Sequence, residues 1–175
     1  MSPYKSFETE RLLLKPTSEE DAPFLLGLLN TPKWLQYIGD RNVKSVEDAQ
    51  VYIRNRMTPQ LERLGFSNYT IIRKSDGVKV GVCGLYDREG LEGIDIGFAF
   101  LPEHEGKGYA FEAASEIKRA GVEEFGIGQI RAITAKDNIA SQKLLEKLGL
   151  RYSKMVQLPN DNEELMLYEI TLQTN

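Results

Sequence analysis

The period of the hydrophobic pattern changes along the chain, and this change restricts the possible folds more than any other feature. In the middle of the chain, Tyr69–Arg73, Lys79–Tyr86 and Ile94–Leu101 have the pattern of strands. Ser75-Asp76-Gly77 separates the first two, and an Asp-Gly pair supplies the positive φ that a tight hairpin turn requires. The middle of the chain is therefore expected to form antiparallel strands.

The second half of the chain alternates helices and strands. Small and apolar residues recur at helical spacing over Gly108–Phe125, so this helix can lie close against a sheet. The segments that follow are a strand, a helix ended by Gly149, and two closing strands: Gln129–Thr134, Asn138–Leu148, Arg151–Leu158 and Glu164–Leu172. Strand-helix-strand-helix-strand within an otherwise antiparallel set predicts a mixed sheet of the α/β (α+β) class, with helices on both faces.

The first third of the chain is mainly helical. Arg11–Lys15 is a short strand candidate, and a helix is expected from Thr17 to Leu29, ending before a proline. A second helix is predicted over Ser45–Met57, and Pro59 disfavours its continuation. We find no repeat and no linker, so the 175 residues are expected to form a single domain, 1–175, with about seven strands.

Charge and rare residue types exclude several classes of function. The 22 Lys and Arg against 26 Asp and Glu give a net charge of −4 without a basic block, so no nucleic acid is expected as a ligand. A single cysteine, Cys83, and a single histidine, His104, exclude a zinc site built from Cys and His, and we expect no metal. No apolar stretch approaches the ~18 residues of a membrane span. We therefore expect a cytoplasmic protein without a membrane partner.

A glycine-bearing loop carries the strongest functional signal. Glu105-Gly106-Lys107-Gly108-Tyr109-Ala110 leaves a predicted strand and enters a predicted helix. Glycines expose backbone N–H groups, and the positive end of the helix dipole lies behind them, which favours an anion such as a pyrophosphate. The spacing matches neither Gly-x-Gly-x-x-Gly nor a Walker loop. The alternative is a plain strand-to-helix turn that uses glycine for its geometry.

A second motif follows the next strand. Asn138-Ile139-Ala140-Ser141 begins a helix that ends in Glu146-Lys147-Leu148-Gly149-Leu150, and Asn at a helix start is by itself most often a cap. Together with the glycine loop, with Glu8–Leu14 and with Ile94–Phe98, it resembles the GNAT superfamily of N-acetyltransferases. The resemblance extends over roughly Phe7 to Leu172 and is greatest to the RimJ/RimL-like branch, which acetylates N-termini of ribosomal proteins.

The resemblance implies acetyl-CoA as co-substrate and a V-shaped splay between two central parallel strands, into which the pantetheine arm inserts. It implies backbone contacts to that arm from the end of the third middle strand, amide contacts to the pyrophosphate from the loop, and contacts from the second motif. The implied cofactor-binding residues are Ala99, Phe100, Leu101, Gly106, Lys107, Gly108, Tyr109, Ala110, Asn138 and Ser141. A Glu at Gly108 is expected to place a carboxylate in the pyrophosphate site and to abolish binding.

The sequence departs from the family pattern at two positions. Glu105 stands where the family has Gln or Arg, so we expect its carboxylate to face solvent and the anion to be held by backbone amides and Lys107. Leu145 stands where many relatives carry a Tyr that protonates the departing thiolate. Ser141 is the nearest substitute as a catalytic acid. Its alternative role is to stabilise the first turn of its helix.

Asp95 is the first candidate for a catalytic base, because it lies roughly where histone-acetylating relatives carry a glutamate. Strand alternation places it on one face with Gly97 and Ala99. The alternative is an Asp that is simply paired or solvated on its strand. A backbone N–H near Phe100 would stabilise the oxyanion of the thioester. The aromatic residues expected to line the acceptor pocket are Trp34, Tyr37, Tyr52 and Tyr86, with packing as the alternative for each.

These observations together predict an acetyl-CoA-dependent N-acetyltransferase in which a primary amine attacks the thioester directly within a ternary complex. The expected acceptor is a protein or peptide N-terminal amine. A polyamine, amino acid or antibiotic amine is the alternative, and the excess of acidic residues favours a cationic acceptor. A non-catalytic acyl-CoA-binding module is the rival from another class. The branch resemblance also suggests a homodimer.

Overall fold

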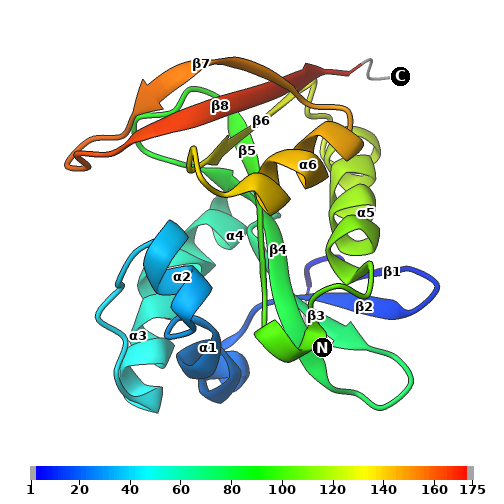
Figure 1. Cartoon of the computed structure of the whole chain (residues 1–175). Coiled ribbons are helices and arrows are strands. Elements are labelled where there is room, and N and C mark those ends of the chain that lie inside the picture. Colours follow the sequence, from blue (N-terminus) through cyan, green and yellow to red (C-terminus); the bar gives the residue numbers. More distant parts are fainter. Residues whose placement is uncertain (1–2, 173–175) are drawn as a thin grey trace.

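The computed structural model describes residues 3–172, which form one eight-stranded sheet with helices packed against it (Figure 1). The strands are β1 (Phe7–Glu8), β2 (Leu12–Pro16), β3 (Asn68–Arg73), β4 (Lys79–Asp87), β5 (Ile94–Phe100), β6 (Gln129–Thr134), β7 (Arg151–Gln157) and β8 (Glu164–Thr171). The α-helices are α1 (Ala22–Leu28), α2 (Pro32–Tyr37), α3 (Val46–Arg56), α4 (Thr58–Leu64), α5 (Tyr109–Glu123) and α6 (Ile139–Lys147). Two 3-10 turns are η1 (Glu19–Asp21) and η2 (Pro102–His104).

The strand order is β1-β2-β3-β4-β5-β6-β8-β7, and among the described strands only β5 and β6 pair in parallel. The mixed, mostly antiparallel sheet expected from the sequence is thus confirmed. The strand that sequence reasoning missed is β1, which has two residues and is too short to show a period. No helix within residues 3–172 has both the length and the apolar character needed to cross a membrane.

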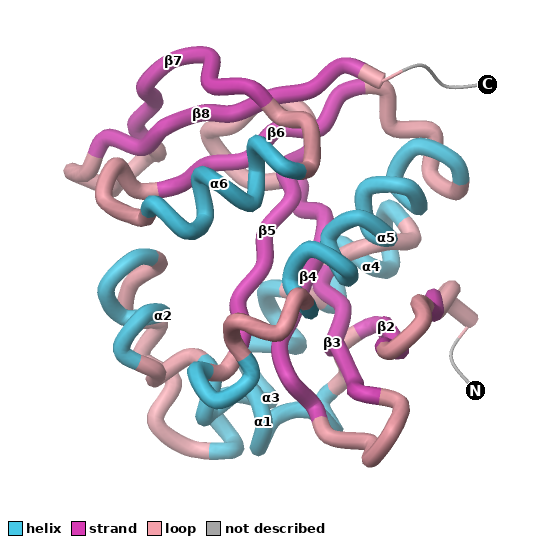
Figure 2. Tube along the Cα trace, turned by 45° about the vertical axis from the view of Figure 1, so that its right-hand side comes forward, coloured by secondary structure: helices cyan, strands magenta, loops and turns pink. Residues whose placement is uncertain are grey.

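The parallel pair opens almost as soon as it forms. β5 and β6 are matched only at Ile94 with Ile130 and at Asp95 with Arg131, although the strands have seven and six residues. Beyond these pairs β5 continues beside β4, while β6 continues beside β8 across the end of the sheet (Figures 1 and 2). The V-shaped splay is therefore present, with its closed end at Asp95.

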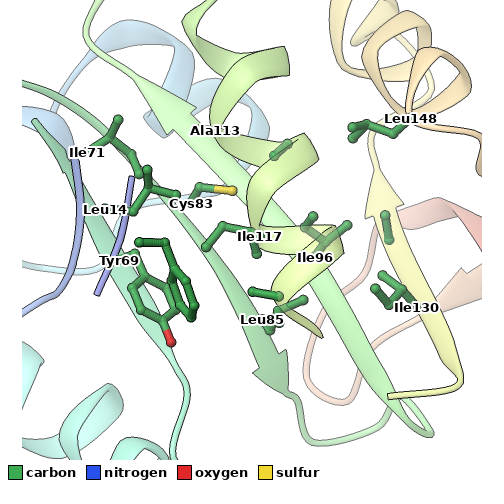
Figure 3. Packing of buried hydrophobic residues seen from close by; sticks show 14 of the residues in the cluster. Leu14, Tyr69, Ile71, Cys83, Leu85, Ile96, Ala113, Ile117, Ile130 and Leu148 are labelled. Atoms are coloured by element: carbon green, nitrogen blue, oxygen red, sulfur yellow. The ribbon is translucent and has the colours of Figure 1, made fainter. Parts of the chain in front are cut away.

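One face of the sheet packs against α5 through an apolar core. Ile117 is fully buried among residues of β2, β3, β4, β5 and β6 (Figure 3). Small residues on the inner side of α5 bring the helix close to the strands: a Cβ added at Gly121 would lie 3.2 Å from Leu85 Cδ1. The small-sided stripe predicted for this helix is confirmed by the burial of Ala113, Ala114, Ala120 and Gly121.

The opposite face packs against α1 and α3 through a second cluster that includes Leu25, Ile53 and Val82. Two short helices here were not predicted, because their prolines were taken only as ends. Pro32 and Pro59 instead stand in the first turns of α2 and α4. Proline is tolerated there because the first N–H groups of a helix have no intrahelical acceptor.

Candidate functional site

The glycine loop presents free backbone amides at the start of α5. Gly106 (φ +73°) and Gly108 (φ +82°) adopt the left-handed conformation that glycine allows, and both are exposed. The first intrahelical bond runs from the Glu112 N–H to the Gly108 carbonyl, at 3.1 Å. The N–H groups of Tyr109 and Ala110 therefore have no intrahelical acceptor and lie at the positive end of the helix dipole.

Arg11 holds the loop in place through hydrogen bonds and a ring contact, although the sequence analysis gave this residue no role. Arg11 Nη1 donates to the Lys107 carbonyl at 3.0 Å, its Nε donates to Glu112 Oε1 at 2.7 Å, and its guanidinium carbon lies 4.6 Å from the centroid of the Tyr109 ring. Glu112 also accepts from Thr9 Oγ1 at 2.5 Å. Burial raises the pKa of Glu112, but these hydrogen bonds outweigh it and lower the pKa overall. The signal available in the sequence was an Arg inside the Glu8–Leu14 motif.

Arg11 also bears on the design of a charged variant at position 108. A Cβ added at Gly108 would lie 3.3 Å from Arg11 Nη2, so a side chain at this position would point toward Arg11. A side chain at Gly106 would instead enter open space, because no heavy atom lies within 4 Å of the added Cβ. Position 106 is therefore the cleaner place to introduce a charge.

Backbone groups on β5 face the splay in alternation. The Leu101 N–H donates to the Val80 carbonyl at 3.0 Å, and the Leu101 carbonyl accepts from the His104 N–H at 2.9 Å. Because strand alternation makes Ala99 face β4 as well, the groups that face the splay belong to Phe98 and Phe100. Of the three residues expected to pair with a pantetheine arm, Phe100 has its backbone groups on the side of the splay, as does Phe98, whereas Ala99 and the Leu101 N–H face β4.

The start of α6 is capped by Asn138, whose side-chain oxygen accepts from the Ser141 N–H at 3.3 Å. The capping role that sequence reasoning left open is thus present, and within the described residues it leaves the Asn138 NH2 group as a donor. Ser141 is half-buried in the first turn of α6. Leu145 is 1% exposed and packs in the α5-side core, so this position is used for packing.

Asp95 lies at the closed end of the splay and is paired. Its side chain is 1% exposed, and Arg88 donates to both carboxylate oxygens, at 3.2 Å from Nε and 3.1 Å from Nη2. Burial raises the pKa of Asp95, and Arg88 offsets part of this rise. Of the alternatives that the sequence left open for Asp95, the structure shows the paired side chain. The rise in pKa that burial causes would also suit a base.

Tyr86 lies flat on the face opposite α5, over two glycines. A Cβ at Gly97 would lie 2.9 Å from Tyr86 Cε2, and a Cβ at Gly84 would lie 2.8 Å from the Tyr86 hydroxyl. The hydroxyl donates to Asn68 Oδ1 at 2.5 Å. Burial is the largest of the effects that raise the Tyr86 pKa well above its usual value.

A chain of polar contacts continues from Asn68 toward the other end of the sheet. Asn68 Nδ2 donates to Thr17 Oγ1 at 2.8 Å, the hydroxyls of Thr17 and Thr70 are 2.9 Å apart, and Thr70 donates to Asp21 at 3.0 Å. Lys79 closes the chain with an ion pair of 2.6 Å to Asp21. Sequence reasoning missed this polar chain, because its residues are far apart in the sequence.

The other aromatic candidates are distributed over α2 and α3. Trp34 is 9% exposed within the second core cluster, and its Nε1 is buried without a hydrogen-bond partner among the described residues. Tyr37 and Tyr52 are half-buried. The end of α2 that carries Tyr37 lies toward the first turn of α6 in both views (Figures 1 and 2). Trp34 is thus mainly a packing residue, whereas Tyr37 is the last residue of α2, at the end of that helix nearer to α6.

The glycine loop also receives a contact from α2. Lys33 Nζ lies 2.5 Å from Glu105 Oε2, so the carboxylate expected to face solvent is only partly exposed and is paired.

The order of these parts matches a known family. The acetyltransferase (GNAT) domain family matches residues 11–151, which hold the splay, the glycine loop and the start of α6. The chain belongs to the GNAT acetyltransferase family. A relative from Bacillus subtilis (strain 168), named uncharacterized N-acetyltransferase YoaA, is 28% identical over 145 residues, which cover 82% of this chain and 81% of the relative. This GNAT chain is accordingly an acetyltransferase.

Solved structures share the fold over nearly the whole length. RimL, the ribosomal L7/L12 alpha-N-protein acetyltransferase in complex with coenzyme A, is similar with a TM-score of 0.83 at 18% identity, covering 98% of this chain and 100% of that one. The ribosomal-protein-S5-alanine acetyltransferase from Vibrio fischeri gives a TM-score of 0.79 at 16% identity, covering 95% and 96%. At these identities the likeness establishes the fold alone, which this chain shares with RimL and with the Vibrio fischeri protein.

Proposed function

We propose that this GNAT protein transfers the acetyl group of acetyl-CoA to a primary amine by direct attack within a ternary complex. The observation that carries the proposal is the two-residue pairing of β5 with β6, since it leaves the β5 edge open next to a loop of free amides. The amides at Gly106 to Ala110 and the charge of Lys107 suit a pyrophosphate. The backbone groups of Phe98 and Phe100 suit the amides of a pantetheine arm.

The chemistry requires a neutral amine and a protonated leaving group. As the amine nitrogen forms its bond to the thioester carbonyl carbon, the carbon–sulfur bond breaks and the amine loses a proton. Asp95 is our candidate acceptor for that proton, because burial raises its pKa toward the range in which a base works best. Ser141 is our candidate hydrogen-bond donor to the departing sulfur, to which it relays a proton from solvent water, since a Ser hydroxyl is too weak an acid to act without such help. The Phe100 N–H is our candidate donor to the carbonyl oxygen as negative charge develops there.

The acceptor we favour is the N-terminal amine of a protein or peptide. RimL and the Vibrio fischeri protein, which share the fold, are named as acetyltransferases of ribosomal proteins. A small cationic amine, such as a polyamine or an antibiotic, is the second candidate, favoured by the net charge of −4. We assign the reaction to the cytoplasm, in keeping with a single buried cysteine that has no partner for an internal disulfide.

The loop assignment is tested by titrating acetyl-CoA into the wild type, Gly106→Asp and Gly106→Asn. Asn and Asp have nearly the same shape and both tolerate positive φ, so the two variants differ mainly by one charge. We expect micromolar binding to the wild type, a modest loss for Gly106→Asn, and a loss at least about tenfold larger for Gly106→Asp. Equal affinities of the two variants would refute a pyrophosphate at this loop.

The reaction is tested by thiol release from acetyl-CoA in the presence of amines. A peptide with a free N-terminus is compared with the same peptide blocked at that amine, and with a polyamine. Release with the free peptide alone supports the favoured acceptor, and release with the polyamine alone supports the second candidate. Tight acetyl-CoA binding without release above background for any amine would leave a binding module and contradict the proposed transfer.

A further inference from the structure

The loop that we assign to the pyrophosphate contains a carboxylate. Glu105 directly precedes Gly106, and its backbone is held by a hydrogen bond from its N–H to the Pro102 carbonyl at 3.2 Å. An unpaired carboxylate at this place would repel the two negative charges of a pyrophosphate. Glu105 therefore needs a neutralising partner if the loop is to bind this anion.

The cations near the loop differ in their availability. Arg11 is bound to Glu112 and to the Lys107 carbonyl, and Arg73 is paired with Asp76 at 2.6 Å. Both guanidiniums are thus engaged in contacts that hold the protein together. Lys33 is held less firmly, because its side chain is 56% exposed and its contact is the Glu105 carboxylate alone among the described ion pairs.

Lys33 comes from a distant segment. It lies in the first turn of α2, 72 residues before Glu105, and its ammonium reaches Glu105 Oε2 at 2.5 Å. Exposed ion pairs of this kind add little to folding stability, so exchanging one anionic partner for another costs little. A lysine ammonium on a flexible stem has three donors and can contact a carboxylate and a phosphate together.

We propose that Lys33 is a cofactor-binding residue that α2 contributes to the acyl-CoA anion site: it neutralises Glu105 and donates to the pyrophosphate. This inference rests on the proposed function. The same pair explains how the chain tolerates Glu where the family pattern has Gln or Arg, because the positive charge is supplied from α2. Since α2 ends at Tyr37, the pair also links the anion site to the helix that carries a candidate acceptor-pocket residue.

The test is a double-mutant cycle read by titration with acetyl-CoA, using the wild type, Lys33→Gln, Glu105→Gln and the double variant. We expect Lys33→Gln to weaken binding about tenfold, because it leaves Glu105 unpaired next to the phosphates. Glu105→Gln should bind as tightly as the wild type or more tightly. The double variant should recover most of the loss, since neither the attraction nor the repulsion remains.

Lys5→Gln is the matched control. The Lys5–Glu124 pair has nearly the same exposure as Lys33–Glu105, 59% and 31% against 56% and 31%, but it lies at the other end of α5. We expect this variant to bind acetyl-CoA as the wild type does. Acetyl-pantetheine, which lacks the pyrophosphate, is the second probe. Its KM and kcat in thiol release should be unchanged by Lys33→Gln, whereas the KM for acetyl-CoA should rise at constant kcat.

The outcomes separate this inference from the proposed function. Failure of the wild type to bind acetyl-CoA would overturn both. Normal wild-type binding with unchanged affinity in Lys33→Gln would overturn the role of Lys33 alone. The role of Lys33 would also be overturned if the double variant bound acetyl-CoA no more tightly than Lys33→Gln. An equal loss of activity with acetyl-pantetheine would overturn it as well. A purely structural effect on α2 would produce either result.

Discussion

The sheet is covered by apolar and small side chains on the α5 face. On the opposite face an apolar cluster lies beside a chain of polar contacts from Lys79 to Tyr86, whose middle members are buried. The α5 face supports the glycine loop and the edge of β5, which act through backbone groups. The opposite face holds side chains with defined hydrogen-bond partners, including Asp95 and Tyr86. Under the proposed function, binding of acetyl-CoA should therefore depend on backbone geometry, and handling of the acceptor should depend on side-chain chemistry.

The largest expected effect on stability comes from truncating a core side chain on the α5 face. This change tests whether that face only supports the fold. Ile117→Ala removes a fully buried side chain between α5 and the sheet. We expect the free energy of unfolding to fall by about 2–5 kcal/mol. Denaturant unfolding measures this loss. Below the unfolding transition, acetyl-CoA affinity and acceptor preference should stay within about twofold of the wild type, and a changed preference would show that this face does more than support the fold.

The next effect concerns the buried pair on the other face. Asp95→Asn removes a charge that Arg88 contacts through two nitrogens. Breaking a fully buried ion pair lowers the free energy of unfolding by roughly 3–5 kcal/mol. We expect a smaller loss here, because Arg88 is 32% exposed. The pKa of Asp95 is higher in the folded than in the unfolded state, because burial disfavours the charged carboxylate. The protonated Asp95 therefore adds to the free energy of unfolding below its unfolded-state pKa, and this addition is lost as the pH rises through the folded-state pKa.

The same substitution tests the proposed base through the pH profile. If Asp95 accepts the amine proton, wild-type kcat/KM should fall on the acidic side as Asp95 becomes protonated, at a pH above the ordinary Asp pKa of about 3.9. In Asp95→Asn that acidic limb should disappear and the rate should be low throughout. An acidic limb that persists in the variant would assign the proton to another group and leave Asp95 a structural partner of Arg88.

A smaller effect is expected where Tyr86 lies on the sheet. In Gly97→Ala the added methyl group would lie 2.9 Å from Tyr86 Cε2, so the ring has to move. Overpacking of this kind costs about 1–3 kcal/mol. We expect kcat/KM for the acceptor to fall while the Kd for acetyl-CoA changes by less than about twofold. Gly27→Ala, in α1, is the control, because no heavy atom lies within 4 Å of its added Cβ. A matching loss of acetyl-CoA affinity in Gly97→Ala would contradict the division between the two faces.

The sequence predicted the parts of this molecule that depend on neighbouring residues. The Asp76-Gly77 turn, the α5 stripe and β6 at Gln129–Thr134 were located from local pattern alone. The helices α2 and α4 were missed because a proline was taken as an end when it stood in a first turn. The glycine loop could be singled out because backbone N–H groups are its expected binding groups and its two glycines, Gly106 and Gly108, lie only two positions apart.

The side-chain partners could not be predicted in this way. The Lys33–Glu105 pair joins residues 72 positions apart, and the Asp21–Thr70 contact joins residues 49 positions apart. Such contacts are fixed by the packing of whole elements and leave no local period. The same reason explains why Asp95 was placed on a strand face while its partner, Arg88, was not identified.

The smallest effect on stability is expected for Ser141→Ala, at the start of α6. The bond that caps this helix uses the Ser141 backbone N–H, at 3.3 Å from Asn138 Oδ1, so removal of the hydroxyl leaves the cap in place. We expect the unfolding free energy to stay within about 0.5 kcal/mol of the wild type. If the hydroxyl donates to the departing sulfur, kcat should fall about tenfold with little change in acetyl-CoA affinity. Ser153→Ala, on the exposed strand β7, should change neither. Lost affinity at constant kcat would make Ser141 a ligand contact, and would contradict a role for its hydroxyl at the departing sulfur.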